Sequence, residues 1–403
     1  MDRSGLLPAF PHDLRAVCRP GNHRVAGCSG ARWCDVSEIF KLTTAERLWR
    51  LLQRTDDLLI ELLNAPSRIG GAFAQTTKMK AIYIENYGGP EALRYGELPR
   101  PVPKPGQVLV EVRAAAVNPR DWLLREGRYV FRHLMRGFPL VLGSDVSGVV
   151  VEVGPNTNHF ERGVPVFGMQ TPFGRMGGYA EYIAISEAAL ARKPEGVSHE
   201  EAAAVPCAAL TAYGALVRIG RVGPKSHVLI VGASGGVGSY AVQIAKALGA
   251  SVTAVTSTAN IILVQSLGAD RVIDYKTERF TSVIRNQNVV FDAIGRESLT
   301  SCRLVLASGG RYITTIPNGR TAMQSAISGL RRFATGGRTP SAHVVLVRAN
   351  GHDLERIAGL MAEGRIRSVI DSVYPLHDAR GAHEKSRSWR TRGKLVLRVQ
   401  MGA

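Results

Sequence analysis

A strand that runs directly into a glycine-rich turn and then a helix is the feature that most limits how this chain can fold. The apolar run Val228–Val231 leads into Gly232-Ala233-Ser234-Gly235-Gly236-Val237-Gly238, and a helical pattern continues to Gly249. Gly235 and Gly236 let the backbone approach a pyrophosphate, and Gly238 lets the helix pack closely on the strand. Free N–H groups at the helix start attract phosphate charge. The complete strand–turn–helix context favours a dinucleotide site over a tight turn without a ligand.

The end of the following strand bears on which dinucleotide binds. The strand ends at Val255-Thr256-Ser257-Thr258, where sites for NADH place an acidic residue, and no acid occurs before Asp270. A missing carboxylate removes repulsion against a 2′-phosphate, and the hydroxyls of Ser257 and Thr258 can donate to it. This pattern favours NADPH over NADH. No arginine follows directly, because Ala259 and Asn260 come next, although Lys276 and Arg279 could approach from the next loop.

The spacing of strands and helices predicts two folding units after an N-terminal extension. Residues 79–205 hold β-branched runs bounded by Gly and Pro, which predict an antiparallel, barrel-like domain. Residues 206–342 alternate strands with helical segments, which predicts a parallel sheet. The last segment, 343–403, contains a helix at His352–Glu363 and a closing strand at Lys394–Val399. Residues Gly329–Pro340 are expected to form a mobile loop. The predicted strands of the first two segments are Met79–Glu85, Gln107–Ala114, Val146–Val153, Val228–Val231, Ser251–Val255, Arg271–Ile273, Val289–Phe291 and Arg311–Thr315.

Residues 1–78 have a different texture. The first 40 residues mix Gly, Pro, Arg, His and Cys without a period, whereas leucines recur at helical spacing over 43–64. Two interpretations stay open: an additional helix that docks on the body, or an upstream extension before a natural start at Met79. On either interpretation we expect residues 1–78 to be dispensable for cofactor binding.

The composition is that of a globular protein with a basic surface. The chain has 403 residues, 21% charged residues and a formal net charge of +18. The basic residues are scattered and form no recognisable nucleic-acid module. The five cysteines make no CxxC pair, which favours free thiols in a reducing cytoplasm. No apolar run is long enough for a membrane span.

Several motifs, in one order, carry a resemblance to a known family. From Met79 to about Val399 the chain resembles the medium-chain dehydrogenase/reductase superfamily, in its zinc-free quinone oxidoreductase-like branch. The resemblance implies an α/β protein in which a GroES-like β-rich catalytic domain, 79–205 completed by 343–403, joins a Rossmann doubly wound parallel-sheet domain at 206–342. The motifs are Lys80-Ala81-Ile82, Ala115-Ala116-Val117-Asn118-Pro119-Arg120-Asp121, Leu142-Gly143-Ser144-Asp145-Val146-Ser147-Gly148, Gly177-Gly178-Tyr179-Ala180-Glu181-Tyr182, Ala208-Ala209-Leu210-Thr211-Ala212-Tyr213, Val272-Ile273-Asp274-Tyr275 and Phe291-Asp292-Ala293-Ile294-Gly295.

The zinc ligands of related alcohol dehydrogenases are replaced. Those enzymes carry Cys where Asn118 stands and His-Glu where Ser144-Asp145 stands, and the four-cysteine lobe for a structural zinc is missing. Asp145 alone cannot make the closed ligand set that zinc needs. Without a metal an alcohol is hard to deprotonate, whereas a quinone or a conjugated carbonyl is itself an electron sink. We therefore expect no zinc, and hydride transfer to a quinone, enone or enal.

The resemblance also implies positions for the cofactor. Pyrophosphate contacts are expected at the turn, the adenosine phosphate near the second and third strands, and the nicotinamide near Thr211 and the ends of later strands. For Tyr275, a packing role at a strand end is the alternative. The cofactor residues expected are Thr211, Ser234, Gly235, Gly236, Val237, Gly238, Ser257, Thr258, Tyr275, Ala293, Ile294, Gly295 and Thr315.

Two residues are candidates for catalysis. The amide of Asn118 suits the oxygen on which charge develops. Tyr129, in Gly127-Arg128-Tyr129, resembles a proton-donating tyrosine of related enoyl-thioester reductases, although it could instead be a loop aromatic that closes over the cofactor. Asp121 is expected to brace a turn. The competing interpretation is a cofactor-binding redox sensor or scaffold with little turnover. A homodimer is compatible with either interpretation.

Overall fold

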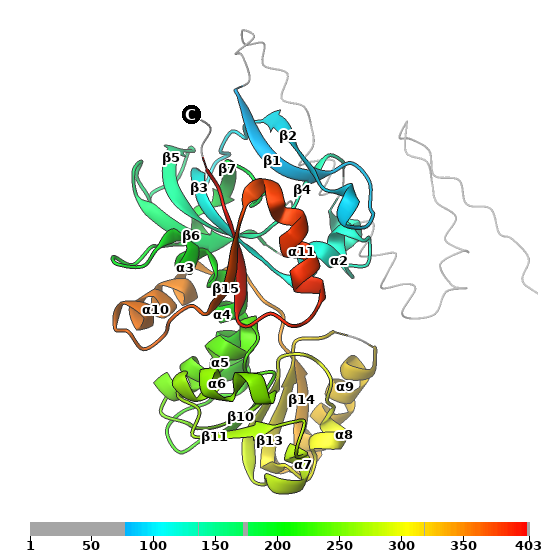
Figure 1. Cartoon of the computed structure of the whole chain (residues 1–403). Coiled ribbons are helices and arrows are strands. Elements are labelled where there is room, and N and C mark those ends of the chain that lie inside the picture. Colours follow the sequence, from blue (N-terminus) through cyan, green and yellow to red (C-terminus); the bar gives the residue numbers. More distant parts are fainter. Residues whose placement is uncertain (1–76, 136, 172–175, 318, 401–403) are drawn as a thin grey trace, which may run out of the picture. The chain divides into compact units, whose positions relative to one another are not determined.

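The computed structural model describes residues 77–400, except 136, 172–175 and 318. The leucine-rich segment 43–64 therefore lies outside the described residues. The described residues form two large sheets and one small sheet, and Figure 1 shows the two large sheets in different parts of the ribbon. Among the described residues no helix is long and apolar enough to cross a membrane.

The first sheet is mostly antiparallel and contains both early and late parts of the chain. Its order is β15-β16-β3-β5-β6-β8, and β7 also pairs with β3. β16 pairs antiparallel with β3, so the C-terminal segment returns to the first sheet. The strands are β3 (Gln107–Val117), β5 (Asp145–Val153), β6 (Pro165–Met169), β7 (Tyr182–Ser186), β8 (Leu190–Arg192), β15 (Ile370–Pro375) and β16 (Lys394–Arg398). A small sheet of β1 (Lys78–Ile84), β2 (Arg94–Pro99) and β4 (Leu140–Val141) lies beside helices α2 (Pro119–Arg125) and α11 (Ala379–Arg387).

The second sheet is wholly parallel, with the order β11-β10-β9-β12-β13-β14. The chain adds β10 and β11 on one side of β9 and then crosses to β12 on the other side. Ligands of open α/β sheets bind at such a reversal, outside the carboxyl ends of the strands. The strands are β9 (His227–Val231), β10 (Ser251–Thr256), β11 (Arg271–Asp274), β12 (Gln287–Asp292), β13 (Leu306–Thr314) and β14 (Ser341–Val344). The helices of this half include α4 (Pro206–Tyr213), α5 (Gly236–Ala247), α6 (Ile261–Ser266), α7 (Phe280–Val283), α8 (Leu299–Cys302) and α9 (Gly319–Ala334).

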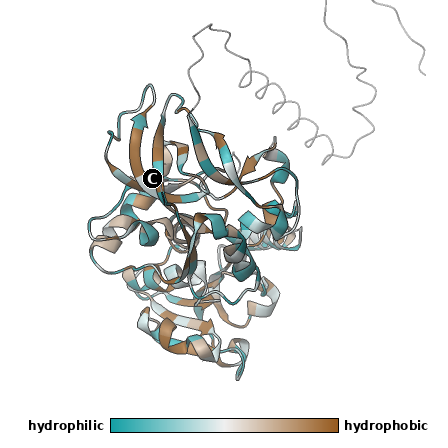
Figure 2. Cartoon of the chain, turned by 45° about the horizontal axis from the view of Figure 1, so that its top comes forward, coloured by the Kyte–Doolittle hydropathy of each residue, from teal (hydrophilic) through white to brown (hydrophobic). Residues whose placement is uncertain are grey.

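The cores follow the predicted strands. In Figure 2 the hydrophobic residues are concentrated in the strands of both sheets, and hydrophilic residues occupy the connections. The largest buried cluster joins β9 and β10 to α4, α5 and α10 (Gly351–Ala362), and a second fills the first sheet. The GroES-like and Rossmann architecture expected from the sequence is confirmed. The short helix α3 (His199–Ala203) follows β8 in the chain and precedes α4.

The prediction of a mobile loop at Gly329–Pro340 is wrong for its first half, because α9 continues to Ala334. The helix is held by polar side chains: the Ser328 hydroxyl accepts from the Ala342 N–H, and Arg332 donates to the Gly309 carbonyl. Its apolar side chains point outward instead, with Phe333 90% exposed. This pattern is the inverse of the usual amphipathic helix, whose apolar face is buried, so the sequence did not indicate a helix here.

Candidate functional site

The glycine-rich turn has the geometry that a pyrophosphate needs. Gly235 is the N-cap of α5, and Gly232 has φ +80°, which favours glycine. A Cβ at Gly238 would collide with the Gly232 carbonyl oxygen, so the close packing of helix on strand requires glycine there. A Cβ at Gly235 would meet only that oxygen, at 3.5 Å. The surface over Gly235 is therefore open, whereas the start of β16 already lies against Gly236.

Ser234 connects this turn to the second strand of the sheet. Its hydroxyl oxygen accepts from Thr256 Oγ1 and from Asn260 Nδ2, each at 3.0 Å. Asn260 Nδ2 also donates to the Ser257 hydroxyl over 3.3 Å. Because Ser234 accepts twice, its own hydroxyl proton remains for a phosphate oxygen. The residues predicted from the turn and from Ser257 are thus brought together.

Thr258 has a partner that the sequence did not reveal. Its hydroxyl donates to the Asp274 carboxylate over 2.5 Å, across the ends of β10 and β11. This bond, together with the Lys276 N–H, keeps the pKa of Asp274 below its usual value. An acid therefore stands at the carboxyl end of β11, where the ribose is expected, although none follows β10 directly in the chain. Tyr275, next to it, is 58% exposed, which argues against a packing role.

The loops after β12 and β13 meet the glycine-rich turn at the sheet reversal. The Ala293 N–H donates to the Val231 carbonyl over 3.1 Å, and Thr315 Oγ1 donates to the Ala293 carbonyl over 3.2 Å. The N–H groups of Ile294 and Gly295 donate to the buried Asp292 carboxylate, which fixes this loop. All of the residues expected after the later strands thus lie at one edge of the sheet.

Asn118, on the first sheet side, is held in a single orientation. Its Nδ2 donates to Asp145 Oδ2 over 3.1 Å, and its Oδ1 accepts from Lys394 Nζ over 2.5 Å. Asp145 is fully buried and also accepts from the Ser144 hydroxyl and the Cys207 N–H. One N–H of Nδ2 stays free of these bonds, so Asn118 can offer one donor in a fixed direction.

Lys394 is the functional residue that sequence reasoning missed. The Gly393 N–H donates to the Ser234 carbonyl over 2.8 Å, which seats the start of β16 against the nucleotide turn. The Lys394 stem passes Gly236, and its ammonium, only 4% exposed as a residue, reaches Asn118. In the sequence, the indication of Lys394 was its position after Gly393 at the start of the final strand, and this position does not identify the residue that Lys394 contacts.

Tyr129 lies in the same polar neighbourhood as Arg120 and Cys207. Burial raises the pKa of Tyr129, and the positive charge of Arg120 opposes that rise. Burial likewise raises the pKa of the Cys207 thiol to about 11, which disfavours the reactive thiolate form. Thr211, one turn further along α4, donates its hydroxyl to the Cys207 carbonyl over 2.7 Å.

Asp121 braces the start of α2, as expected. Its Oδ2 accepts from the Asn118 N–H over 2.8 Å and from the Tyr179 hydroxyl over 2.9 Å. Burial raises the pKa of this carboxyl to about 6. Among the described residues, no group of three or more His, Cys, Asp or Glu side chains could hold a metal ion.

Comparisons with known proteins match both halves of the described chain. A family model described as an alcohol dehydrogenase GroES-like domain matches residues 104–195, and one described as a zinc-binding dehydrogenase matches residues 267–397. A chloroplastic quinone oxidoreductase of Triphysaria versicolor is 36% identical over 79% of this chain and 98% of its own. A mitochondrial NAD(P)H oxidoreductase of Homo sapiens is 34% identical, over 82% of this chain and 92% of its own.

Two further comparisons extend this picture. A 2-methylene-furan-3-one reductase of Solanum lycopersicum is 31% identical over 89% of this chain and 91% of its own. The solved structure of a quinone oxidoreductase from Coxiella burnetii superposes with a TM-score of 0.72 at 30% identity, and covers 80% of this chain and 100% of that one.

Proposed function

Because the chain belongs to the quinone oxidoreductase-like branch of the medium-chain dehydrogenase/reductase superfamily, we propose that it reduces quinones and α,β-unsaturated carbonyl compounds with NADPH and without zinc. The family makes it an oxidoreductase that uses a nicotinamide cofactor. The preference for NADPH, the independence from zinc and the acceptor class are the parts that the proposal adds.

The observation that carries the proposal is the link that Lys394 makes between the nucleotide turn and Asn118. Lys394 would then lie between a cofactor bound at Ser234 and Gly235 and an acceptor oxygen bound at Asn118. When bound, the nicotinamide supplies the hydride. The protein then has to orient the acceptor and stabilise the charge that develops on its oxygen.

Asn118 and Tyr129 suit these two tasks. Asp145 and Lys394 fix the Asn118 amide, so its free N–H can donate to an acceptor oxygen without reorganisation. Tyr129 is protonated at neutral pH, since the ordinary pKa of a tyrosine is about 10 and burial raises the pKa of this hydroxyl further. It can therefore return a proton to an enone after reduction. Quinones need less of this assistance.

Independence from zinc is supported by the charge at the replaced ligand positions. The Lys394 ammonium contacts Asn118 and lies 4.0 Å from Asp145 Oδ2. A divalent cation between the same residues would be repelled by this ammonium and would find one carboxylate. We expect metal analysis of the purified protein to find no stoichiometric zinc, and chelators to leave activity unchanged; near one zinc per chain would refute this.

The preference for NADPH is supported by Ser257 and by the absence of an acid directly after β10. The bond between Thr258 and Asp274 acts against it, because it commits the Thr258 proton and places a carboxylate near the ribose. We therefore propose that NADPH is preferred and that Asp274 limits the preference. Titration of both cofactors against the intrinsic fluorescence of the protein tests this, and tighter NADH binding would overturn it.

The proposal also includes a homodimer in the cytoplasm. β14 is the outermost strand of its sheet in the described structure, and the exposed apolar side chains of α9 lie beside it. An edge strand and an apolar stripe together form a self-complementary surface.

Cys207 and Cys302 are free thiols, which suits a reducing compartment. Sedimentation at several concentrations and cell fractionation test these two points. The exposed apolar side chains of α9 are Met323, Ile327, Leu330 and Phe333.

The direct test is NADPH oxidation with a panel of quinones and enones. Loss of the Asn118 donor should cost about 2.7–4 kcal/mol in the barrier if it acts as an oxyanion-hole group. Asn118→Ala should therefore slow turnover with nearly unchanged NADPH affinity, and Tyr129→Phe should slow enones more than quinones. Tyr95→Phe, at a half-exposed tyrosine on β2, is the control. Parent rates in both site variants would refute the assignment. No turnover with any acceptor would favour the sensor or scaffold.

A further inference from the structure

Arg120 in α2 is buried, and its guanidinium makes no hydrogen bond of good geometry, although the Tyr129 hydroxyl lies near enough to interact with it. The residue is 8% exposed, and its Nε, Nη1 and Nη2 atoms are all buried without a partner among the described residues. Burial alone would lower the pKa of Arg120, but the acidic groups of Cys207, Asp121 and Asp145 raise it above its usual value. The group is therefore charged. A buried charge without direct partners is costly, and sites that keep one use it for binding.

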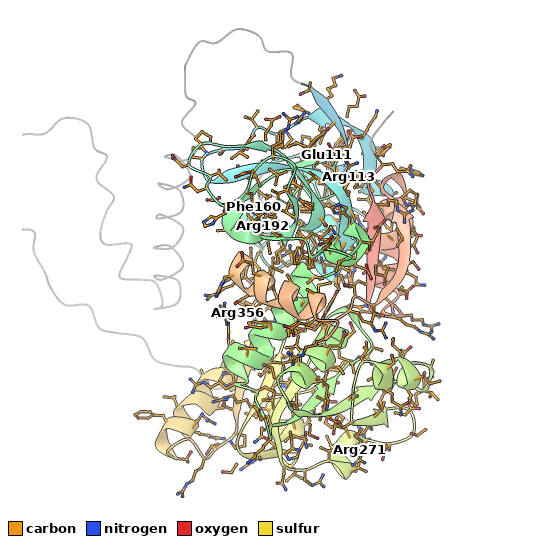
Figure 3. All side chains as sticks on the ribbon, turned by 90° about the vertical axis from the view of Figure 1, so that its left-hand side faces the viewer. Glu111, Arg113, Phe160, Arg192, Arg271 and Arg356 are labelled. Atoms are coloured by element: carbon orange, nitrogen blue, oxygen red, sulfur yellow. The ribbon has the colours of Figure 1, made fainter. Side chains whose placement is uncertain are left out.

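Other arginines of the chain do have partners. Arg113 forms an ion pair with Glu111, and the Arg192 guanidinium lies 5.8 Å from the centroid of the Phe160 ring; both pairs are labelled in Figure 3. In the described structure Arg120 forms no ion pair within 4.0 Å. Arg125, the other buried arginine of the described residues, donates to the Gly88 carbonyl and to Glu126, so burial in this fold does not by itself leave an arginine unpaired.

The acidic neighbours of Arg120 are engaged elsewhere. Asp145 accepts from Asn118, Ser144 and the Cys207 N–H. Asp121 Oδ2 accepts from the Asn118 N–H and from Tyr179, while Asp121 Oδ1 is buried without a partner. These carboxylates keep Arg120 charged through space but leave its planar set of N–H donors unused.

Arg120 lies in the same polar neighbourhood as the catalytic candidates. Arg120 is close enough to Tyr129 to oppose the rise in the pKa of its hydroxyl, and it also acts on the Cys207 thiol. Asn118 is two residues away in the chain. A ligand group held by Arg120 would therefore lie beside the acceptor site and not on a remote surface.

We propose that Arg120 binds a carboxylate of the hydride acceptor, so that the preferred substrates are conjugated ketones or quinones that carry an ionised acid group. A guanidinium presents five N–H donors in a plane and matches a carboxylate with two parallel bonds. A neutral carbonyl oxygen would satisfy fewer donors and leave the buried charge uncompensated. The inference rests on the proposed reductase function. The carboxylate only anchors: hydride adds to the carbon β to the ketone, a proton adds to the α carbon, and the double bond becomes single.

The kinetic test compares β-acetylacrylate with its methyl ester, which share one conjugated ketone and differ in charge. The parent protein should prefer the acid by at least about tenfold in kcat/KM, mainly through KM, as expected for a charge-assisted pair. Arg120→Gln should remove the preference, and Arg120→Lys should retain part of it. Arg128→Gln, at an exposed arginine in the same segment, should retain all of it. An equal loss for acid and ester in Arg120→Gln would overturn the proposal.

A second measurement does not depend on turnover. Laevulinate, the saturated product, should bind the NADP⁺-saturated protein in calorimetry, and methyl laevulinate should bind at least about tenfold more weakly. Arg120→Met should lose laevulinate binding yet melt at the same or a higher temperature, because it removes an unpaired buried charge. Arg120-dependent laevulinate binding without turnover would contradict the reductase and keep the anion site. Turnover of neutral enones with no binding of laevulinate would support the reductase and contradict the anion site.

Discussion

Lys394 Nζ donates to Asn118 Oδ1 over 2.5 Å, although the two residues are 276 positions apart. The same lysine starts β16, which the Gly393 N–H ties to the Ser234 carbonyl. The glycine-rich turn and the Asn118 amide are therefore connected through two adjacent residues, Gly393 and Lys394. A movement of the turn on cofactor binding would therefore shift Lys394 and change the position of the Asn118 amide.

Removal of Lys394 should impair the acceptor step more than the fold. In Lys394→Met, Asn118 loses a charge-assisted hydrogen bond of about 1.5–3 kcal/mol. We expect kcat/KM to fall by about tenfold or more, with the loss in kcat because Lys394 positions Asn118. Lys385→Met, which removes a half-exposed lysine paired with Asp371, should change neither parameter. Unchanged kinetics in Lys394→Met would contradict the coupling.

Two alanine substitutions in the glycine-rich turn should have different consequences. Gly238→Ala places a Cβ against the Gly232 carbonyl and should lower the melting temperature. Gly235→Ala places its Cβ in the open space over the turn, so the fold should persist while NADPH affinity falls by about tenfold or more. Gly223→Ala, where a Cβ meets nothing within 4 Å, is the control. Equal melting and cofactor affinity in Gly235→Ala would show that no ligand lies there.

Asp274 should restrain the preference for NADPH. Asp274→Asn removes a negative charge near the expected 2′-phosphate and frees Thr258 from a charged acceptor. At an effective dielectric near a protein surface, this should shift the NADPH-to-NADH affinity ratio by roughly 1 kcal/mol, or about fivefold. Fluorescence titrations of both cofactors measure the ratio. Asp270→Asn, before the opposite end of β11, should leave it unchanged. A ratio that moves toward NADH would contradict this placement.

Asp121 should make stability depend on pH in a recognisable direction. Because burial raises the pKa of its carboxyl from 3.8 to about 6, the folded state holds a proton that the unfolded state releases. The associated stability is present below pH 4 and is lost as pH rises through 6, by about 3 kcal/mol at most. Urea unfolding at pH 5 and pH 7.5 should therefore show Asp121→Asn gaining on the parent protein at the higher pH.

The comparison with Asp121→Asn is needed because a second group acts oppositely. Burial lowers the pKa of His383 to about 3, so its contribution is present above pH 6.5 and is lost as pH falls. The parent curve sums both effects, and only the difference between variant and parent isolates Asp121. A difference that is constant between pH 5 and pH 7.5 would contradict the raised pKa.

Local patterns predicted the fold well because its elements are specified by neighbouring residues. The strand–turn–helix at 228–249 needs only apolar residues, glycines and a helical period, and all three lie within one stretch of chain. The alternation of strands and helices likewise predicted the parallel sheet. α9 was missed because its polar side chains face inward, which reverses the usual pattern.

The sequence by itself determined the glycine-rich strand–turn–helix and the two kinds of sheet. Tertiary structure decided the partners: Lys394 at Asn118, Asp274 at Thr258, and the isolation of Arg120. Backbone geometry follows from local sequence, whereas contacts between distant side chains arise only when both sheets have folded. The type of a residue determines which groups its side chain can bind, and its position in the fold determines which groups the side chain contacts.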